Sequence, residues 1–361
     1  MHAARFYGQR DIRVEDIDSP KIREPDDVLV EVAFCGICGT DLHEYTSGPI
    51  VTPTSPHPLT GATLPQTLGH EFSATVVEVG SAVGDVRVGD RVAIMPAIIC
   101  GRCYYCRRGM GHLCLSFACT GLSAETGGLA RYAVVKEYQV ATLPDDVSDL
   151  EGAVIEPAAV AAYGVRRAGV TGGDVVLVTG AGPIGVLTAM YADAVGAATV
   201  VIAEPNPRRA ALAREMDIGP VVDPTADGFG AVLDDLTHGV GVDLAVECSG
   251  SSPGLASCLE HTRRAGSVVQ TGLHTKPATI DAMLLSEKDL TLYGSWCWNT
   301  TDWPRIIRMV ASGKYPVGKA VTAQIALEDV VAQGFDVLVD PQGDQLKVLV
   351  SAADSTGGTS S

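Results

Sequence analysis

The sequence lacks any apolar run of the roughly 18 residues that a membrane-spanning helix requires. It also lacks an excess of basic charge, because 43 acidic side chains outnumber 26 basic ones and give a formal net charge of −17. A nucleic-acid-binding face or an anionic-membrane-binding surface needs the opposite balance. The start of the chain, Met1–Phe6, lacks the basic-then-apolar plan of a secretion signal. We therefore expect a cytoplasmic protein with neither nucleic acid nor a membrane as partner, whereas the charge says nothing about a small neutral substrate.

Disulfide bonds are not expected in that setting, because cytoplasmic thiols are kept reduced. The ten cysteines are then better explained as metal ligands or as small buried hydrophobic residues. The length of 361 residues is sufficient for two domains, each with its own core. The sequence contains no internal repeat.

Four of the cysteines lie within 15 residues, at Cys100, Cys103, Cys106 and Cys114. Four thiolates at such short spacings match the tetrahedral coordination of zinc and leave no open position for chemistry. We therefore predict a structural zinc lobe. A redox dithiol would leave the third and fourth cysteines without a role, and a zinc ribbon for nucleic acid is disfavoured by the acidic balance. Core or pocket packing is expected for the remaining cysteines, Cys35, Cys119, Cys248, Cys258 and Cys297.

A second concentration of reactive groups is Cys38-Gly-Thr-Asp-Leu-His43, with a thiol, a hydroxyl and an imidazole within six residues. A thiolate can ligate a metal, a hydroxyl can hydrogen-bond a substrate oxygen, and an imidazole can pass a proton to solvent. The proline-rich residues 48–65 that follow are either a surface excursion or a wall of a site. His70 and Glu71 come next, and Glu156 lies in an apolar run where a carboxylate must be solvated, paired or bound to a metal. Residue chemistry alone leaves open whether these three are ligands.

The second half of the chain carries a glycine motif. The strand-like run 174–179 ends in Gly180-Ala-Gly182-Pro183-Ile184-Gly185, and a helical pattern follows. The next strand ends in Glu204, 19 residues after Gly185, which is where dinucleotide-binding proteins hold the ribose 2′-hydroxyl. The glycines permit a tight turn and close approach of a pyrophosphate to a helix N-terminus. Glu204 would repel a 2′-phosphate and so favours NAD over NADP, whereas Arg208 and Arg209 could accommodate the phosphate.

Strand and helix patterns alternate from residue 174 to residue 295, which predicts an α/β fold with a doubly wound parallel sheet. Thr271-Gly-Leu273 ends a late strand, where such sheets present residues to a nicotinamide. Trp296-Cys-Trp298 is an aromatic concentration in a chain that is only 5% aromatic, and it indicates either core packing or the lining of a pocket.

Together these motifs resemble the zinc-containing medium-chain alcohol dehydrogenases over nearly the whole chain. The resembling segments are 33–45, 57–61, 68–72, 103–109 and 276–281. Within that family their amino-acid sequences are most similar to those of 2,3-butanediol dehydrogenases. The resemblance implies a GroES-like β-rich catalytic domain at 1–157, which contains the zinc lobe, and a Rossmann NAD-binding domain at 158–295. It also implies a return to the catalytic domain at 296–350. The tail at 351–361, rich in Ser, Gly and Thr, is expected to be disordered.

The same resemblance implies two zinc ions per chain. The catalytic zinc would be held by Cys38, His70 and Glu156, with Glu71 beside it as an outer or exchanging ligand. The best-known family members carry cysteine at the position of Glu156, and the polyol-type branch carries glutamate. Thr40 would hydrogen-bond the substrate oxygen, and His43 would relay its proton to solvent. The implied cofactor-binding residues are Gly180, Gly182, Pro183, Ile184, Gly185, Glu204, Arg209, Thr271, Gly272 and Leu273.

The implied reaction is hydride transfer between NAD and a small secondary alcohol or vicinal diol, with 2,3-butanediol and acetoin as the expected pair. An L-threonine or sorbitol-type polyol dehydrogenase would share every metal and cofactor residue named. A non-catalytic NAD-binding sensor would need neither Thr40 nor His43. The resemblance implies a homotetramer, with a dimer as the alternative.

Overall fold

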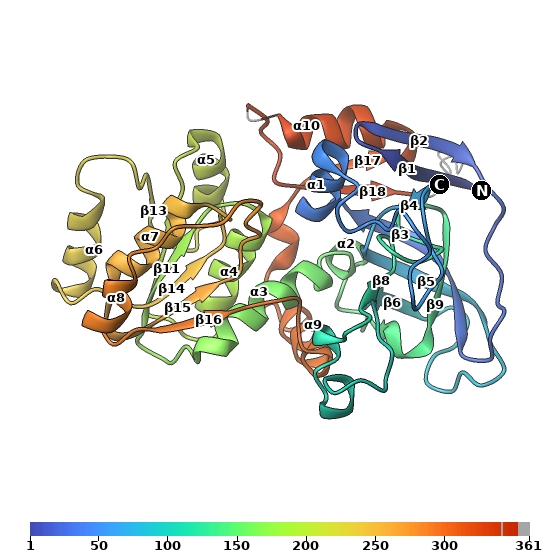
Figure 1. Ribbon diagram of the computed structural model, residues 1–361, viewed down its shortest axis with the longest axis horizontal. Coiled ribbons are helices and arrows are strands. Elements are labelled where there is room, and N and C mark those ends of the chain that lie inside the picture. Colours follow the sequence, from blue (N-terminus) through green and yellow to red (C-terminus); the bar gives the residue numbers. More distant parts are fainter. Residues whose placement is uncertain (341, 353–361) are drawn as a thin grey trace. The chain divides into compact units, whose positions relative to one another are not determined.

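The computed structural model describes residues 1–340 and 342–352 (Figure 1). The chain forms two compact units. Unit 1 comprises Met1–Glu156, Asn299–Ala311 and the segment from Val321 onward, and unit 2 comprises Pro157–Trp298 and Ser312–Ala320. The sequence-based division assigned all of 296–350 to the first domain, whereas the structure places 296–298 and 312–320 with the second.

Tyr315 gives the physical reason for this difference. Its side chain is fully buried, and its hydroxyl donates to the carbonyl oxygens of Ala158 at 3.3 Å and Leu187 at 3.0 Å, both in unit 2. Its ring also packs against Tyr191, with 5.4 Å between the ring centroids. These long-range contacts, which no local pattern announces, hold residues 312–320 in unit 2.

Unit 1 is built mainly on antiparallel strands, although β17 and β18 pair in parallel. A seven-stranded sheet runs in the order β10-β6-β5-β3-β18-β17, with β9 also paired to β3, and smaller sheets are formed by β2-β1-β4 and β7-β8. Val28, Val30 and Val32 on β3 are all at most 1% exposed, which follows from the period-two alternation of the strand. The strands are β1 His2–Gly8, β2 Asp11–Asp16, β3 Asp27–Gly36, β4 Gln66–Thr67, β5 Glu71–Val79, β6 Arg91–Ile94, β7 Ala97–Ile98, β8 Ala118–Cys119, β9 Tyr132–Lys136, β10 Val140–Thr142, β17 Val321–Ala326 and β18 Lys347–Ser351.

The helices of unit 1 are few and short. In α9 the buried residues Trp303, Ile306, Ile307 and Val310 follow the spacing of one helix face. The α-helices are α1 Gly39–Ser47, α2 Asp149–Gly152, α9 Trp303–Ala311 and α10 Asp336–Val339, and α3 Ile155–Ala168 begins in unit 1 and continues into unit 2. Residues 48–65 form the expected loop between α1 and β4.

Unit 2 is a six-stranded parallel sheet in the order β13-β12-β11-β14-β15-β16, which confirms the predicted doubly wound fold. The strand order reverses between β11 and β14, the switch point at whose carboxyl edge such sheets bind ligands. The strands are β11 Val175–Thr179, β12 Thr199–Ala203, β13 Val221–Val222, β14 Val242–Glu247, β15 Thr262–Gln270 and β16 Thr291–Gly294. The helices are α4 Pro183–Ala194, α5 Pro207–Glu215, α6 Phe229–Thr237, α7 Ser252–His261 and α8 Ala282–Glu287.

Two local expectations are corrected by the structure. Trp298 is buried at 3% exposure, whereas Trp296 is 53% exposed and therefore not a core residue. Ser351, placed in the tail from sequence, is the last residue of β18, and the tail from 353 on lies outside the described residues.

Two further observations bear on the sequence-based expectations. All ten cysteines are free thiols. Among the described residues, the structure contains no helix with the length and apolar character needed to span a membrane.

Candidate functional site

The first candidate site, which we call the Cys38 cluster, is assembled by the pairing of β3 with β5. Their antiparallel register sets Gly36 opposite Glu71, so the end of one strand and the start of the other meet. Cys38 follows β3 as the N-cap of α1, and His70 precedes β5. The thiol of Cys38, a ring nitrogen of His70 and a carboxylate oxygen of Glu71 all lie within 4.8 Å of one another.

Asp41 supports this cluster, although sequence reasoning assigned it no role. Its side chain is fully buried and accepts a hydrogen bond from the Cys38 backbone N–H at 3.0 Å. Its other oxygen lies 3.5 Å from His70 Nδ1, and neither of these two atoms makes a hydrogen bond. Burial would lower the pKa of His70, but Asp41 and Cys38 together raise that pKa well above its usual value. A carboxylate behind a histidine is the usual orienting arrangement for a metal ligand.

Lys347 is the second residue that sequence reasoning missed. Its ammonium donates to Glu71 Oε2 at 2.6 Å and to the Ile37 carbonyl oxygen at 3.1 Å, and both charged side chains are 1% exposed. Burial would lower the pKa of Lys347, but the charges of Glu71 and Cys38 raise it. A lone lysine in the apolar run 346–350 was the available signal, because a buried charge needs a partner.

Glu156 is the second residue of α3 and is only 6% exposed. Burial first, and then the negative charge of Glu71, raises its pKa to about 8. It does not fall within the 4.8 Å group that Cys38, His70 and Glu71 form. The structure therefore places Glu71, rather than Glu156, in the tightest grouping with the thiol and the imidazole.

The donor set of the Cys38 cluster fits a divalent cation. Three carboxyl groups, from Asp41, Glu71 and Glu156, interact electrostatically with the half-buried Cys38 or the buried His70, and Lys347 carries the opposing positive charge. A bound cation would balance the remaining acidic charge and favour the ionised form of Glu156. Thiolate, imidazole and carboxylate are the ligands that zinc takes in proteins.

Thr40 and His43, the predicted relay residues, both lie on α1. The Thr40 hydroxyl lies 3.8 Å from Cys38 Sγ, which donates to it. His43 is half-buried and three residues further along, a spacing that puts both side chains on one face of the helix. The structure thus brings Thr40 next to the thiol and His43 one turn away from it.

The predicted zinc lobe, residues 100–114, folds around its four thiols with two short 3₁₀ helices at Cys106–Arg108 and Gly111–Leu113. The Cys106 sulfur lies 3.4 Å from that of Cys103 and 4.0 Å from that of Cys100. Four sulfurs at about 2.3 Å from a zinc ion would be about 3.8 Å apart. All four thiols lie within 4.8 Å of one another, so the residues fit a tetrahedral ion.

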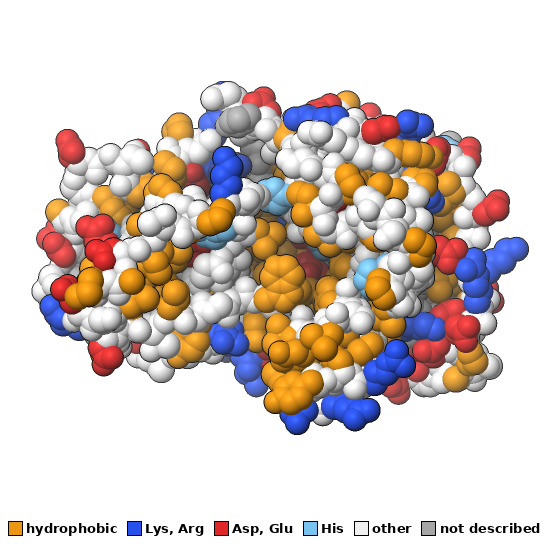
Figure 2. All heavy atoms as spheres, in the orientation of Figure 1, with side chains coloured by type: hydrophobic (Ala, Val, Ile, Leu, Met, Phe, Trp, Pro, Cys, Tyr) orange, Lys and Arg blue, Asp and Glu red, His pale blue; other side chains and the backbone are white. Residues whose placement is uncertain are grey.

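Backbone N–H groups favour thiolate in this lobe. Hydrogen bonds from the N–H groups of Cys106 and Leu115 lower the pKa of Cys103 to about 6. Burial and the neighbouring Cys103 raise the pKa of Cys106 to about 12. The lobe also presents Tyr104, 59% exposed, and Leu115, 74% exposed, and Figure 2 shows hydrophobic side chains flanked by Lys and Arg at this place.

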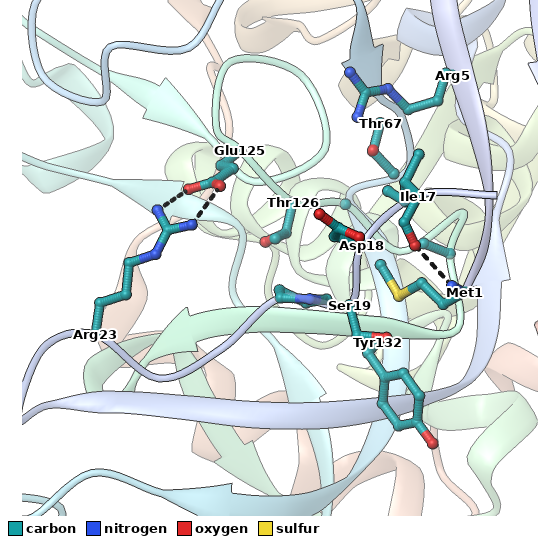
Figure 3. Close-up of a pocket in the computed structure, with 13 residues that line it drawn as sticks. Met1, Arg5, Ile17, Asp18, Ser19, Arg23, Thr67, Glu125, Thr126 and Tyr132 are labelled. Carbon is teal, nitrogen blue, oxygen red and sulfur yellow. Dashed lines mark hydrogen bonds and ion pairs between the residues drawn. The ribbon is translucent and has the colours of Figure 1, made fainter. Parts of the chain in front are cut away.

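A separate pocket of about 280 Å³ lies in unit 1 and is lined by none of the predicted site residues (Figure 3). Its charged groups are largely paired: Arg23 binds Glu125 at 2.8 Å, and the Met1 ammonium donates to the Ile17 carbonyl oxygen at 2.7 Å. Its lining contains neither a thiol nor an imidazole. This pocket therefore lacks the metal-binding side chains that the Cys38 cluster contains.

The glycine motif of unit 2 forms a cradle before α4. A Cβ on Gly185 would lie 1.8 Å from the Gly180 carbonyl oxygen, so only glycine fits there. Gly182 is the N-cap of α4, and a Cβ on it would meet no atom within 4 Å. Pro183 begins the helix and has no N–H, and helix geometry leaves the N–H groups of Ile184 and Gly185 without a partner inside the helix, as anion binding requires.

The acidic residue predicted for the ribose also fixes the glycine loop. The Glu204 carboxylate, 5% exposed, accepts from the Ala181 N–H at 2.7 Å and the Asn206 N–H at 2.8 Å. Arg209 is exposed on α5. After β15 the Thr271 hydroxyl is buried without a hydrogen bond, and Leu273 is 46% exposed. An unsatisfied buried hydroxyl in the loop Thr271–Leu273 fits a segment that binds a polar ligand.

One unit has a parallel sheet with a glycine cradle, and the other has two groups of side chains that could hold a metal ion, one of four thiols and one of thiol, imidazole and carboxylate. Together these features are typical of a metal-dependent, dinucleotide-linked oxidoreductase. The chain belongs to the zinc-binding alcohol dehydrogenase family. Residues 24–145 match the alcohol dehydrogenase GroES-like domain, and residues 183–312 match the zinc-binding dehydrogenase domain. Both matches agree with the fold that the sequence predicted.

Individual relatives cover nearly the whole chain. The (R,R)-butanediol dehydrogenase of Bacillus subtilis is 38% identical over 352 residues, which is 97% of this chain and 99% of that protein. The D-xylulose reductase A of Aspergillus niger is 32% identical over 348 residues, which is 95% of this chain and 94% of that protein.

Solved structures show the same fold. The crystal structure of 2R,3R-butanediol dehydrogenase from Bacillus subtilis matches with a TM-score of 0.89 at 37% identity, covering 97% of this chain and 99% of that one. A zinc-binding dehydrogenase from Sinorhizobium meliloti 1021 bound to NADP matches with a TM-score of 0.86 at 32% identity, covering 97% and 98%.

Proposed function

We propose that this protein is a zinc-dependent, NAD-linked dehydrogenase of small secondary alcohols or vicinal diols, with 2,3-butanediol and acetoin as its substrate pair. The observation that carries the proposal is the grouping of half-buried Cys38 with buried His70 and Glu71 within 4.8 Å, in a chain of the zinc-binding alcohol dehydrogenase family. The full-length likeness to (R,R)-butanediol dehydrogenases supports the substrate.

In this proposal Cys38, His70 and Glu156 hold the catalytic zinc, and Glu71 is an exchanging ligand. The lobe thiols Cys100, Cys103, Cys106 and Cys114 hold a second, structural zinc. When bound, the catalytic metal lowers the pKa of an alcohol hydroxyl and polarises a carbonyl, and the nicotinamide exchanges a hydride with the carbinol carbon.

The chain's own side chains then orient the reactants and move the proton. Thr40, 3.8 Å from the Cys38 sulfur, accepts a hydrogen bond from the substrate hydroxyl. His43, one turn further along α1, passes the released proton to solvent. Asp41 orients His70, and Lys347 neutralises Glu71, so that the charge facing the substrate is set by the remaining ligands.

The proposed cofactor is NAD. The glycine cradle before α4 receives the pyrophosphate, with Pro183 and Ile184 at the start of the helix. Glu204 accepts hydrogen bonds from the ribose hydroxyls with its remaining lone pairs and repels a 2′-phosphate. Arg209 could still bind the 2′-phosphate of NADP. Because a relative was solved with NADP bound, the activity assay compares NAD with NADP.

The test is reduced-nicotinamide formation from the three stereoisomers of 2,3-butanediol, with NAD and NADP compared and with or without a zinc chelator. L-threonine, sorbitol and xylitol run beside them. Chelator-sensitive reduction of NAD by one or two butanediol isomers supports the whole proposal. Activity with threonine or a polyol alone keeps the mechanism and overturns the substrate.

A polyol dehydrogenase is the second candidate, and the likeness to D-xylulose reductases favours it specifically. A third outcome is NAD binding without activity on any alcohol, which would indicate a sensor. The sensor function is disfavoured because the structure brings Thr40 to the thiol within 3.8 Å, a contact that a sensor does not need.

We also propose a homotetramer in the cytoplasm. The edge strand β16, with Leu292 39% exposed, and the exposed Tyr104 and Leu115 of the lobe are surfaces that subunits could cover. Ten free cysteines suit a reducing compartment. Light scattering coupled to gel filtration distinguishes the tetramer from the alternative dimer.

A further inference from the structure

Glu247 is a fully buried carboxylate to which neither the sequence nor the proposed reaction gives a role. It is the last residue of β14, beside the point where the strand order of the parallel sheet reverses. A buried carboxylate is stable only when hydrogen bonds or charges compensate it. The groups that compensate Glu247 come from the loops at the carboxyl edge of the sheet.

One oxygen of Glu247 organises the turn that follows its own strand. Oε1 accepts hydrogen bonds from the Ser249 N–H at 2.7 Å, the Gly250 N–H at 2.8 Å and the Ser249 hydroxyl at 2.5 Å. Three donors on one oxygen fix this turn tightly. A Cβ on Gly180 would lie 3.0 Å from Ser249, so this turn packs closely against the first glycine of the glycine motif.

The same residue holds the loop that follows β15. Its backbone oxygen accepts from the N–H groups of Thr271 and Gly272, both at 2.9 Å. Its second carboxylate oxygen, Oε2, lies 3.3 Å from Nε2 of His274, whose side chain is 16% exposed. A Cβ on Gly272 would lie 2.3 Å from the Gly250 nitrogen and 2.6 Å from Glu247 Oε2, so the two loops interlock around the carboxylate.

We infer that Glu247 is a positioning residue for the nicotinamide end of the cofactor. The inference rests on the proposed function, because it takes the loop Thr271–Leu273, which the sequence predicts to face the nicotinamide, as part of the NAD site. Glu247 holds the backbone of Thr271 and Gly272 through its carbonyl oxygen and the turn 248–250 through its carboxylate. A glutamine at 247 keeps one acceptor oxygen but turns an NH₂ group toward either the N–H groups of the turn or His274. One of the two loops must then shift.

The test measures the Kd of NADH for the purified zinc-loaded protein by the fluorescence of the bound dinucleotide. Glu247→Gln is expected to weaken NADH binding about tenfold, the effect of one hydrogen bond to a charged group. The KM for NAD should rise with it, while the zinc content and the KM for the alcohol stay unchanged. A substitution that only lowered stability would not raise the Kd of NADH and the KM for NAD while leaving the KM for the alcohol unchanged.

Asp243→Asn is the matched control at the opposite end of the same strand. Asp243 accepts from the Val175 N–H at 2.9 Å and from Arg263 Nε at 2.7 Å, so it also ties neighbouring strands together. This variant should lower thermal stability and leave the Kd of NADH unchanged. Equal weakening by both variants would show that Glu247 acts through general stability and would overturn the inference.

Two further outcomes separate a failure of this inference from a failure of the proposed function. An unchanged NADH affinity in Glu247→Gln overturns the inference and leaves the proposed function intact. Absence of NADH binding by the unsubstituted protein overturns both. If Glu247→Gln does not fold, His274→Gln replaces it, because that partly exposed side chain contacts only one carboxylate oxygen. A measurable weakening then supports the inference, and an unchanged Kd overturns it.

Discussion

The lobe takes its four thiols from one stretch, 100–114, whereas the Cys38 cluster takes its groups from positions 38 and 70–71, with Glu156 as the further proposed ligand. Three of the lobe thiols are half-buried, and backbone N–H groups of the lobe itself lower the pKa of Cys103 to about 6. In the Cys38 cluster Cys38 is also half-buried, but His70 and Glu71 are buried, and burial together with the charge of Glu71 raises the pKa of Glu156 to about 8. A site built from one short segment can fold around its ion. A site built from separate strands forms only when the whole unit has folded, as is typical of a catalytic metal site.

The largest expected effect comes from Cys38→Ser. Because the catalytic metal stabilises the transition state by several kcal/mol, kcat/KM should fall by about 10³ or more. Zinc per chain, measured by plasma mass spectrometry, should fall from two to one. Full activity with both ions retained would remove Cys38 from the ligand set.

Cys106→Ser is the counterpart in the lobe. It should also lose one zinc ion, but the remaining ion should still be the one that supports turnover, since no lobe thiol belongs to the Cys38 cluster. The visible loss should be in thermal stability. Equal effects of the two variants on kcat would erase the distinction between a structural and a catalytic site.

The next effect is on stability, from Lys347→Met. This variant leaves Glu71 buried without its cation, and breaking a buried pair costs about 3–5 kcal/mol in the free energy of unfolding. Denaturant unfolding measures it. The double variant with Glu71→Gln should recover part of the loss, because it removes both charges. No recovery would mean that Lys347 acts through its bond to Ile37.

Asp41→Asn tests how the buried cluster holds its ion. Loss of the carboxylate behind His70 should weaken zinc binding about 10- to 100-fold, the usual effect of removing an orienting partner. A competition titration with a coloured chelator measures the affinity of the weaker-binding ion. Since Asp41 is remote from the lobe thiols in the chain, the affinity of the second ion should not change.

The smallest expected effect is that of His43→Ala. Alcohol oxidation releases a proton, so turnover should slow by about tenfold below about pH 7, where hydroxide is scarce, and approach the unsubstituted rate at high pH. A relay residue that does not touch the reacting atoms is expected to contribute less to the rate than the 10²- to 10⁴-fold of a direct general acid or base. A pH profile of kcat measures it, with zinc content as the control. Loss of the metal would refute the relay role.

The local patterns of the sequence predicted much of this protein. The spacing of the lobe cysteines, the glycine motif after β11 and the strand–helix alternation of unit 2 were all readable, because each lies within one continuous segment. The strand before the glycine motif and the helix after it are where the pattern placed them. The family resemblance added His70 and Glu156, which residue chemistry alone left open.

The tertiary structure decided which distant residues meet. Lys347 reaches Glu71 because β18 pairs with β3, opposite Cys35 and Gly36, and a strand's pairing register is set by the packing of the whole sheet. Asp41 faces His70 for the same reason, through the pairing of β3 with β5. Tyr315 returns 312–320 to unit 2 through hydrogen bonds to residues more than 100 positions away. The sequence by itself determined the local elements and the ligand types, whereas the folded chain decided how the buried charges are paired.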